Sequence, residues 1–328
     1  MAAFALEPVD AVQVTMLMDN VSDTLMTDMG PAKRWGIATR GTAPRRPART
    51  MEEGEVVDNL RAEHGFSVLV AVTKGERTHR FLFDAGTTPD GVTDNARRLD
   101  IDLKDIEVIV LSHGHFDHTT GMEGLIGALG RANMPVYIHP EFWSKRRIAI
   151  PGRDPIEVPT TSRAALTGAG FEIVEERQPS FLFERSVLIT GEVDRTTEFE
   201  KGFPIHQALR DGAWQPDPLI LDDQALILHV RDKGLVVLTG CGHAGIVNIV
   251  RYARKLTGVE QVHAVIGGFH LSGALFDPII PQTVEALGAM APRWIVPAHC
   301  TGWRAQQAFG VRFPDAFVPN SVGTRFEL

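Results

Sequence analysis

The stretch LSHGHFDHTTG, from Leu111 to Gly121, is the feature that most constrains this chain. It places three histidines and one aspartate within six residues. The apolar run DIEVIVL precedes it and predicts a buried strand, so these side chains stand at a strand end, where binding groups are often held on a rigid scaffold. Imidazole nitrogens and carboxylate oxygens bind zinc, and also iron or manganese. The stretch therefore predicts a metal site.

The spacing within this stretch predicts that one loop serves two neighbouring metal positions. His113 and His115 are two residues apart, so in an extended segment their side chains point the same way. Asp117 and His118 follow as the chain turns into the next helix, so they point elsewhere. Gly114 is expected to let the turn form without strain.

Three later apolar runs also end in a histidine. LVVLTGCGH ends at His243 and includes Cys241, HAVIGGFH ends at His270, and RWIVPAHC includes His299. Ligands held at strand ends project from one edge of a sheet and can converge on a common point. We therefore expect these loops to supply the ligands that one loop cannot.

Apolar periodicity predicts a hairpin early in each half of the chain, followed by alternating strands and helices. The hairpins are expected at 66–86 and 224–240. Helices are expected at 95–102, 122–130, 244–256 and 281–290. This order predicts two sheets packed face to face with helices outside, in one domain over 1–328.

Two segments fit this pattern less well. The interval 141–218 has weaker periodicity and is expected to be an insertion between the halves. The interval 20–55 is rich in glycine, proline and arginine. A loop this long inside a compact domain is often functional, so we expect a lid, whose arginines at 33–49 would favour anions.

Composition narrows the class of protein. The 328 residues are 44% hydrophobic and carry a formal net charge of −8, which argues against a nucleic-acid partner. Two cysteines are too few for a disulfide framework, so we expect the protein to work in a reducing compartment. The N-terminus lacks a signal-peptide pattern, and no apolar run approaches the ~20 residues that span a bilayer. We expect a cytoplasmic protein, away from membranes, with a small-molecule substrate.

The pattern His-x-His-x-Asp-His after an apolar strand resembles the metallo-β-lactamase superfamily. FLFDAG resembles its early aspartate motif, and TGCGHAGIVN, GGFHL and PAHCTG resemble its branch of dihydropterin–ribofuranosylaminobenzene-phosphate synthase-like metal-dependent hydrolases. The resemblance implies a four-layer αββα sandwich of the α/β (α+β) class. It also implies two divalent metal ions, with zinc the leading expectation.

The resemblance also implies roles for individual residues. His113 and His115 would bind the first metal. Asp117, His118 and His299 would bind the second, and Asp117 would also orient the water or take its proton. Asp84 in FLFDAG would support the metal loop from behind.

At LTGCGH the chain departs from the usual superfamily pattern, which has PGHT followed by a strand and GD. Two interpretations compete. In one, His243 supplies the imidazole that the absent PGHT segment would provide. In the other, Cys241 stands as a thiolate in the position of the bridging aspartate. The two interpretations can be true together. His270 is a further candidate, either as a ligand or as a catalytic proton donor.

Four residues are candidates for contact with the substrate. His64 in EHGFS is expected at the edge of the site. Glu192, Arg195 and Glu198 lie in GEVDRTTEFE and are expected near the substrate.

If two metals bind, the expected reaction is hydrolysis of an ester, lactone or phosphate bond in a small, anionic metabolite by a metal-activated hydroxide. The branch resemblance adds a pterin-type synthase that releases pyrophosphate. A di-iron redox protein and a non-catalytic metabolite sensor are alternatives on the same fold. The ligands alone do not select the bond, because one scaffold hosts many chemistries.

Overall fold

The structure is a computed structural model that describes residues 4–36, 43–130 and 132–328. The helices are α1 (Gly91–Arg98), α2 (Met122–Ala128), α3 (Arg163–Gly168), α4 (Ile246–Thr257), α5 (Ile280–Gly288) and α6 (Trp303–Arg312). Short 3-10 helices are η2 (Leu103–Asp105), η3 (Phe116–His118), η4 (Pro140–Trp143), η5 (Asp277–Ile279) and η6 (His299–Thr301).

Two large sheets contain most of the strands. The eight-stranded sheet has the order β11 (Phe171–Glu175), β8 (Met134–Ile138), β7 (Val108–Val110), β6 (Arg77–Phe83), β5 (Ser67–Lys74), β1 (Ala11–Met18), β20 (Arg325–Glu327) and β2 (Ala32–Lys33). The six-stranded sheet has the order β12 (Ser180–Leu182), β13 (Val187–Ile189), β16 (Ala225–Val230), β17 (Gly234–Thr239), β18 (Val262–Gly268) and β19 (Trp294–Ala298).

Side chains that alternate along the strands hold the two sheets together. Val68 and Val70 of β5 belong to the same buried cluster as Leu226 and Leu228 of β16. The intervening Leu69 points to the opposite face of its sheet and packs in a different cluster. Because side chains alternate with a period of two, this register directs one apolar set inward and the other outward.

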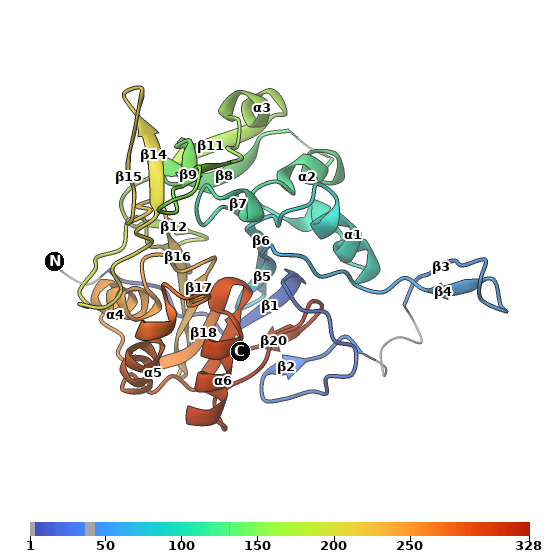
Figure 1. The fold of residues 1–328 in the computed structure, drawn as a ribbon. Helices are drawn as coiled ribbons and strands as arrows, with labels where there is room; N and C mark the ends of the chain where they lie inside the picture. Colours follow the sequence, from blue (N-terminus) through green and yellow to red (C-terminus); the bar gives the residue numbers. More distant parts are fainter. Residues whose placement is uncertain (1–3, 37–42, 131) are drawn as a thin grey trace.

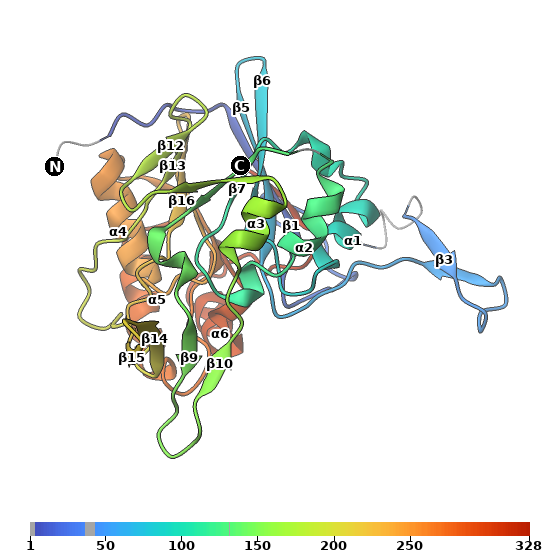
Figure 2. The ribbon, with the colours of Figure 1, turned by 90° about the horizontal axis from the view of Figure 1, so that it is seen from above.

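Helices cover both outer faces. Residues of α1, α2 and α3 share a cluster with the outer face of the eight-stranded sheet, and residues of α4, α5 and α6 do so with the six-stranded sheet. Figures 1 and 2 show these two helix groups on opposite sides of the sheets. The four-layer αββα sandwich predicted for this chain is confirmed.

Most local predictions are also confirmed. The expected hairpins are β5–β6 and β16–β17, and the helices expected at 122–130, 244–256 and 281–290 are α2, α4 and α5. The helix expected at 95–102 is wrong at both ends, since α1 spans Gly91–Arg98. Asp100 adopts a positive φ of 57°, which stops the helix. The short α3 and the longer α6 were not predicted.

The interval expected to be an insertion, 141–218, divides between two structures. Its ends form a separate four-stranded sheet of β10 (Ile156–Val158), β9 (Arg146–Ile148), β14 (His206–Arg210) and β15 (Ala213–Pro216). Its middle, by contrast, contributes β11 to the eight-stranded sheet and β12 and β13 to the six-stranded sheet. Only part of the interval is therefore added to the sandwich.

The described part of the interval 20–55 has two parts. Asn20 and Val21 line a pocket beside the histidine cluster. The hairpin of β3 (Arg45–Pro47) and β4 (Glu55–Val57) projects away from the body of the molecule in both views (Figures 1 and 2). Residues 37–42 lie outside the described residues. The lid stays a prediction.

Across the described ranges, no helix is long and apolar enough to cross a membrane. The longest, α4, has 12 residues.

Candidate metal centre

Four strand ends bring the predicted residues together. β17, β18 and β19 are parallel neighbours, so the loops after them, which hold Cys241 with His243, His270 and His299, lie at one edge of the six-stranded sheet. The loop from Leu111 to Gly121 follows β7 of the facing sheet. The histidine-bearing loops therefore meet at one edge of the sandwich, as the positions of the strand ends predicted.

The first group of metal-ligating atoms consists of three imidazoles, those of His113, His115 and His243. His115 Nδ1 lies 2.9 Å from His113 Nε2 and 3.2 Å from His243 Nε2. One ligand atom from each residue lies within 4.8 Å of the others, which suits one ion.

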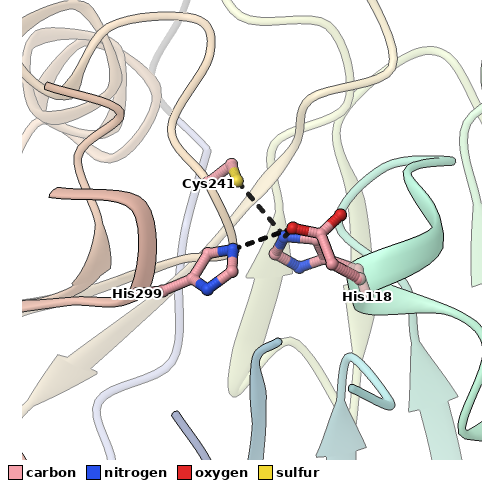
Figure 3. Close-up of side chains that lie close together, drawn as sticks. His118, Cys241 and His299 are labelled. Carbon is pink, nitrogen blue, oxygen red and sulfur yellow. Dashed lines mark hydrogen bonds and ion pairs between the residues drawn. The ribbon is translucent and has the colours of Figure 1, made fainter. Parts of the chain in front are cut away.

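The second group consists of Asp117, His118, Cys241 and His299, all buried. Cys241 Sγ lies 3.2 Å from His118 Nε2, and Asp117 Oδ2 lies 3.2 Å from His299 Nε2. Figure 3 shows the side chains of His118, Cys241 and His299 pointing toward one another. Nitrogen, oxygen and sulfur donors meet here, as in many zinc sites.

The two interpretations of GCGH are both compatible with this geometry, because each residue belongs to a different one of the two groups described above. Cys241 lies with the second group and His243 with the first. Cys241 and His243 also form a third group with His270, whose ring centroid is 4.0 Å from that of His243.

Buried nitrogen atoms without hydrogen-bond partners test whether these residues fit metal ions. Within the described chain, His299 Nε2, His243 Nδ1 and His270 Nδ1 are buried and make no hydrogen bond, and His299 Nε2 has only the ion-pair contact with Asp117 Oδ2 at 3.2 Å. A buried polar atom left unpaired costs about 1–3 kcal/mol, so each such atom calls for an explanation. A bound ion would satisfy His299 Nε2, which points at the second group, and the donor set fits a divalent transition metal.

Asp84 holds the loop from Leu111 to Gly121 in place from behind. Its Oδ1 accepts the backbone N–H of Ser112 at 2.6 Å, and its Oδ2 accepts the Ser112 hydroxyl at 2.7 Å. The same Oδ2 lies 2.6 Å from His118 Nδ1, so it orients the ring with Nε2 toward the second group. Asp84 has a φ of 62°, an unusual conformation that its three contacts maintain.

Burial and neighbouring charges decide the protonation of the imidazoles. Burial lowers the pKa of His113, His115 and His243 well below the ordinary value, so these rings are neutral and their lone pairs are available. For His118 burial alone would lower the pKa, but the charges of Asp84 and Asp117 outweigh it and raise the pKa to about 9. A metal at this position has to displace that proton.

Sequence reasoning missed His206. This buried residue comes from β14 of the added sheet, and its Nε2 lies 2.9 Å from His115 Nε2. Its Nδ1 lies 3.3 Å from the backbone oxygen of Asp217 and 3.5 Å from the Asp217 carboxylate. No strand-end motif precedes His206 in the chain, so no local pattern pointed to it.

A buried ion pair supports the same loop. Arg146 and Asp222 are both fully buried, and Arg146 Nη1 donates to Asp222 Oδ2 at 2.9 Å. The same oxygen accepts the backbone N–H of Gly114 at 2.8 Å. A Cβ on Gly114 would lie 2.1 Å from the backbone oxygen of Phe142. Glycine is therefore required here for close backbone approach, and not for the easy turn that the sequence suggested.

The four candidates for substrate contact lie at different distances from the centre. His64 is close, with Nε2 3.6 Å from Asp117 Oδ2 and an exposed side chain. Arg195 Nη1 donates to the backbone oxygen of His243 at 3.1 Å. Glu192 pairs with Arg177 at 2.9 Å, and Glu198 is exposed. Neither of these glutamates belongs to a ligand group found among the described residues.

Fold and site together define an αββα protein with adjoining groups of metal-ligating side chains at one edge of its sheets. The sequence profile described as the metallo-beta-lactamase superfamily matches residues 60–254, and the chain belongs to this superfamily.

Individual relatives agree with this assignment. A protein of Methanocaldococcus jannaschii named 7,8-dihydropterin-6-methyl-4-(beta-D-ribofuranosyl)-aminobenzene-5'-phosphate synthase is 31% identical over 264 residues, which cover 78% of this chain and 87% of the relative. The resemblance to this branch, expected from TGCGHAGIVN and related motifs, is confirmed. A second protein of that organism, described as uncharacterized, is 32% identical over 249 residues, covering 74% of this chain and 86% of the relative.

Among solved structures, Tm1679, described as a metal-dependent hydrolase of the beta-lactamase superfamily, superposes with a TM-score of 0.70. It is 24% identical, and the match covers 97% of this chain and 99% of that one. The two proteins share the fold.

Proposed function

We propose that this protein is a metal-dependent hydrolase of a small molecule and that it uses two divalent ions. Zinc is the leading candidate for both. One observation carries the proposal: two adjoining groups of metal-ligating atoms, each gathered within 4.8 Å, meet at one edge of the sandwich. Two-metal hydrolytic sites hold their ions a few ångströms apart, which requires two such groups side by side.

Each group would hold one ion. His113, His115 and His243 would hold the first. Asp117, His118, Cys241 and His299 would hold the second. When bound, divalent ions bring the pKa of a coordinated water toward neutrality and polarise the bond to be cleaved.

The chain's own residues would then orient the reactants and move protons. Asp117 Oδ2, in the second group, lies 3.2 Å from His299 Nε2 and 3.6 Å from Nε2 of the exposed His64. This carboxylate would orient a water or accept its proton. His270 lines the pocket beside the centre, and its imidazole would donate a proton to the departing group.

The test combines metal analysis with a substrate panel. The full chain is purified without chelator, its metal content is measured, and lactones, phosphodiesters and thioesters are assayed before and after metal removal. We expect bound transition metal, activity that chelation abolishes and metal restores, and at least a hundredfold loss in His115→Ala. His229→Ala serves as the control, because His229 stands at the far end of β16 from the site. Fresh protein without transition metal, or a fully active His115→Ala variant, contradicts the proposal.

A second candidate is a synthase that releases pyrophosphate. It is favoured by the name of the relative that is 31% identical over 78% of this chain. This reaction would be selected if the protein releases pyrophosphate from a pterin diphosphate and an aminobenzene acceptor. In that case the lactones, phosphodiesters and thioesters should not be hydrolysed. Iron with an oxygen-dependent colour would instead select redox chemistry, and tight ligand binding without turnover would select a sensor.

A further inference from the structure

A pocket of about 580 Å³ opens beside the second metal-binding group. His64, His270 and His299 line its inner end, so a molecule in the pocket has one end at the proposed reaction centre. The outer walls come from three segments far apart in the chain: the added segment with Phe203, the loop before α5 with Leu275 and Phe276, and the start of α6 with Trp303. The volume lies within the ~300–1,000 Å³ of small-molecule sites.

The walls of this pocket are apolar and aromatic. The ring centroid of Phe203 lies 5.3 Å from that of His270 and 5.6 Å from that of Phe276. Trp303 is 73% exposed and Leu275 is 49% exposed at the mouth. Single exposed apolar side chains are ordinary, but these two line the same pocket, whose inner end is formed by histidines of the ligand groups.

No lysine or arginine is among the described residues that line this pocket. Arg304 follows Trp303 in the chain, but its Nη1 pairs with Asp277 Oδ2 at 3.1 Å and it does not line the pocket. Two of the arginines expected to favour anions are engaged elsewhere: Arg34 is buried and donates to Thr324 Oγ1, and Arg45 pairs with Glu55. An anionic group at the outer end of this pocket, away from the histidines, would lose hydration without gaining a counter-charge.

We propose that this pocket binds an uncharged apolar portion of the substrate, an aryl or alkyl group attached next to the reacting bond. This inference rests on the proposed function, because it takes the reacting bond to lie at the metal centre. It replaces the expected anionic metabolite by a substrate whose polar reacting end meets the histidines and whose other end is apolar. Trp303 and Leu275 are then specificity-determining residues, because they close the outer end over that group.

The experiment measures binding separately from turnover. The metal-loaded full chain is titrated by calorimetry with acetate, phenylacetate, hexanoate and succinate, whose carboxylates can all reach the metal centre. We expect phenylacetate or hexanoate to bind at least tenfold more tightly than acetate, and succinate to show no such gain. The order of phenylacetate and hexanoate decides between an aryl and an alkyl group. Equal or tighter binding of succinate, or no binding of phenylacetate and hexanoate at millimolar concentration, overturns the proposal.

Three variants sharpen the test. Trp303→Ala should weaken binding of the preferred apolar ligand about tenfold and leave acetate unchanged. Val311→Ala is the matched control, because Val311 is 86% exposed on the same helix and does not line the pocket. Leu275→Lys should raise the affinity for succinate several-fold by supplying the missing cation. Equal losses in the Trp303 and Val311 variants would contradict the assignment of the pocket.

The two proposals fail in different ways. If the apolar carboxylates bind selectively but no ester, lactone or phosphodiester is turned over, the hydrolase proposal is wrong and the pocket proposal stands. If hexanoyl and succinyl esters are hydrolysed with equal kcat/KM, hydrolysis stands and the pocket proposal is wrong.

Discussion

The Nε2 atoms of His115 and His206 lie 2.9 Å apart, although 91 positions separate these residues in the chain. One of the two nitrogens must carry the proton for this contact to be a hydrogen bond. His115 directs Nδ1 toward the first ligand group, so its Nε2 carries the proton and His206 Nε2 accepts it. His206 Nδ1–H then donates to Asp217. The added sheet thereby orients a residue of the first group of metal-ligating atoms.

Replacing His206 should weaken metal binding. In His206→Ala, His115 loses the partner that orients its ring, and we expect the affinity of the first site to fall about 10–100-fold, as for other supporting residues around metals. Competition with a chromogenic chelator measures this affinity directly. His206→Gln, whose side-chain oxygen can accept the same hydrogen bond, should recover part of it. Unchanged affinity in both variants would show that the contact has no role in metal binding.

Removing the thiol of Cys241 should empty one site and spare the other. Its Sγ lies 3.2 Å from His118 Nε2, whereas the first group has its own three imidazoles. Cys241→Ala should therefore retain about half of the wild-type metal after dialysis, measured by elemental analysis. Cys300→Ala is the control, because Cys300 belongs to none of the ligand groups in the described residues and should keep the full metal content. Full retention by Cys241→Ala would exclude the thiolate as a ligand.

Breaking the ion pair behind the loop should destabilise the protein. Arg146→Met leaves the carboxylate of Asp222 buried without its cation, which typically costs about 3–5 kcal/mol. Urea unfolding of the chelator-treated protein gives the free energy of unfolding. Arg147→Met is the control, since Arg147 is only half-buried and should change stability by about 1 kcal/mol or less. Equal effects of the two substitutions would contradict this explanation.

His263 should make stability depend on pH away from the metal centre. Burial, helped by the charges of Lys233 and Arg293, lowers the pKa of this half-buried imidazole from 6.5 to about 4. The unfolded chain then binds more protons than the folded chain between these values, so stability is full above pH 6.5 and falls as pH decreases through this window. After allowance for solvent screening, the loss is about 1 kcal/mol.

The test compares the wild type with His263→Gln. The difference in their free energies of unfolding, measured in urea at several pH values, should move in favour of the variant between pH 6.5 and 4 and stay constant at higher pH. Parallel pH profiles would show that His263 has the same pKa in the folded and unfolded chain.

Sequence alone determined the sandwich and the cluster of candidate ligands from His113 to His118, because both follow from short-range patterns in the chain. Alternating apolar residues such as Val68 and Val70 define which face of a strand is buried, and the spacing of His113 to His118 defines one loop at one strand end. Boundaries such as that of α1 were less well predicted, since Asp100 stops the helix through its backbone conformation.

Tertiary structure alone decided how the loops combine. It placed Cys241 with one ligand group and His243 with the other and brought His206 to His115. It also lined the pocket with Phe203 and Trp303, with no lysine or arginine among the described residues that line it. These relationships depend on how two sheets and an added sheet pack against one another. Contacts across such distances in the chain follow from the summed burial of the whole core, and no local pattern encodes them.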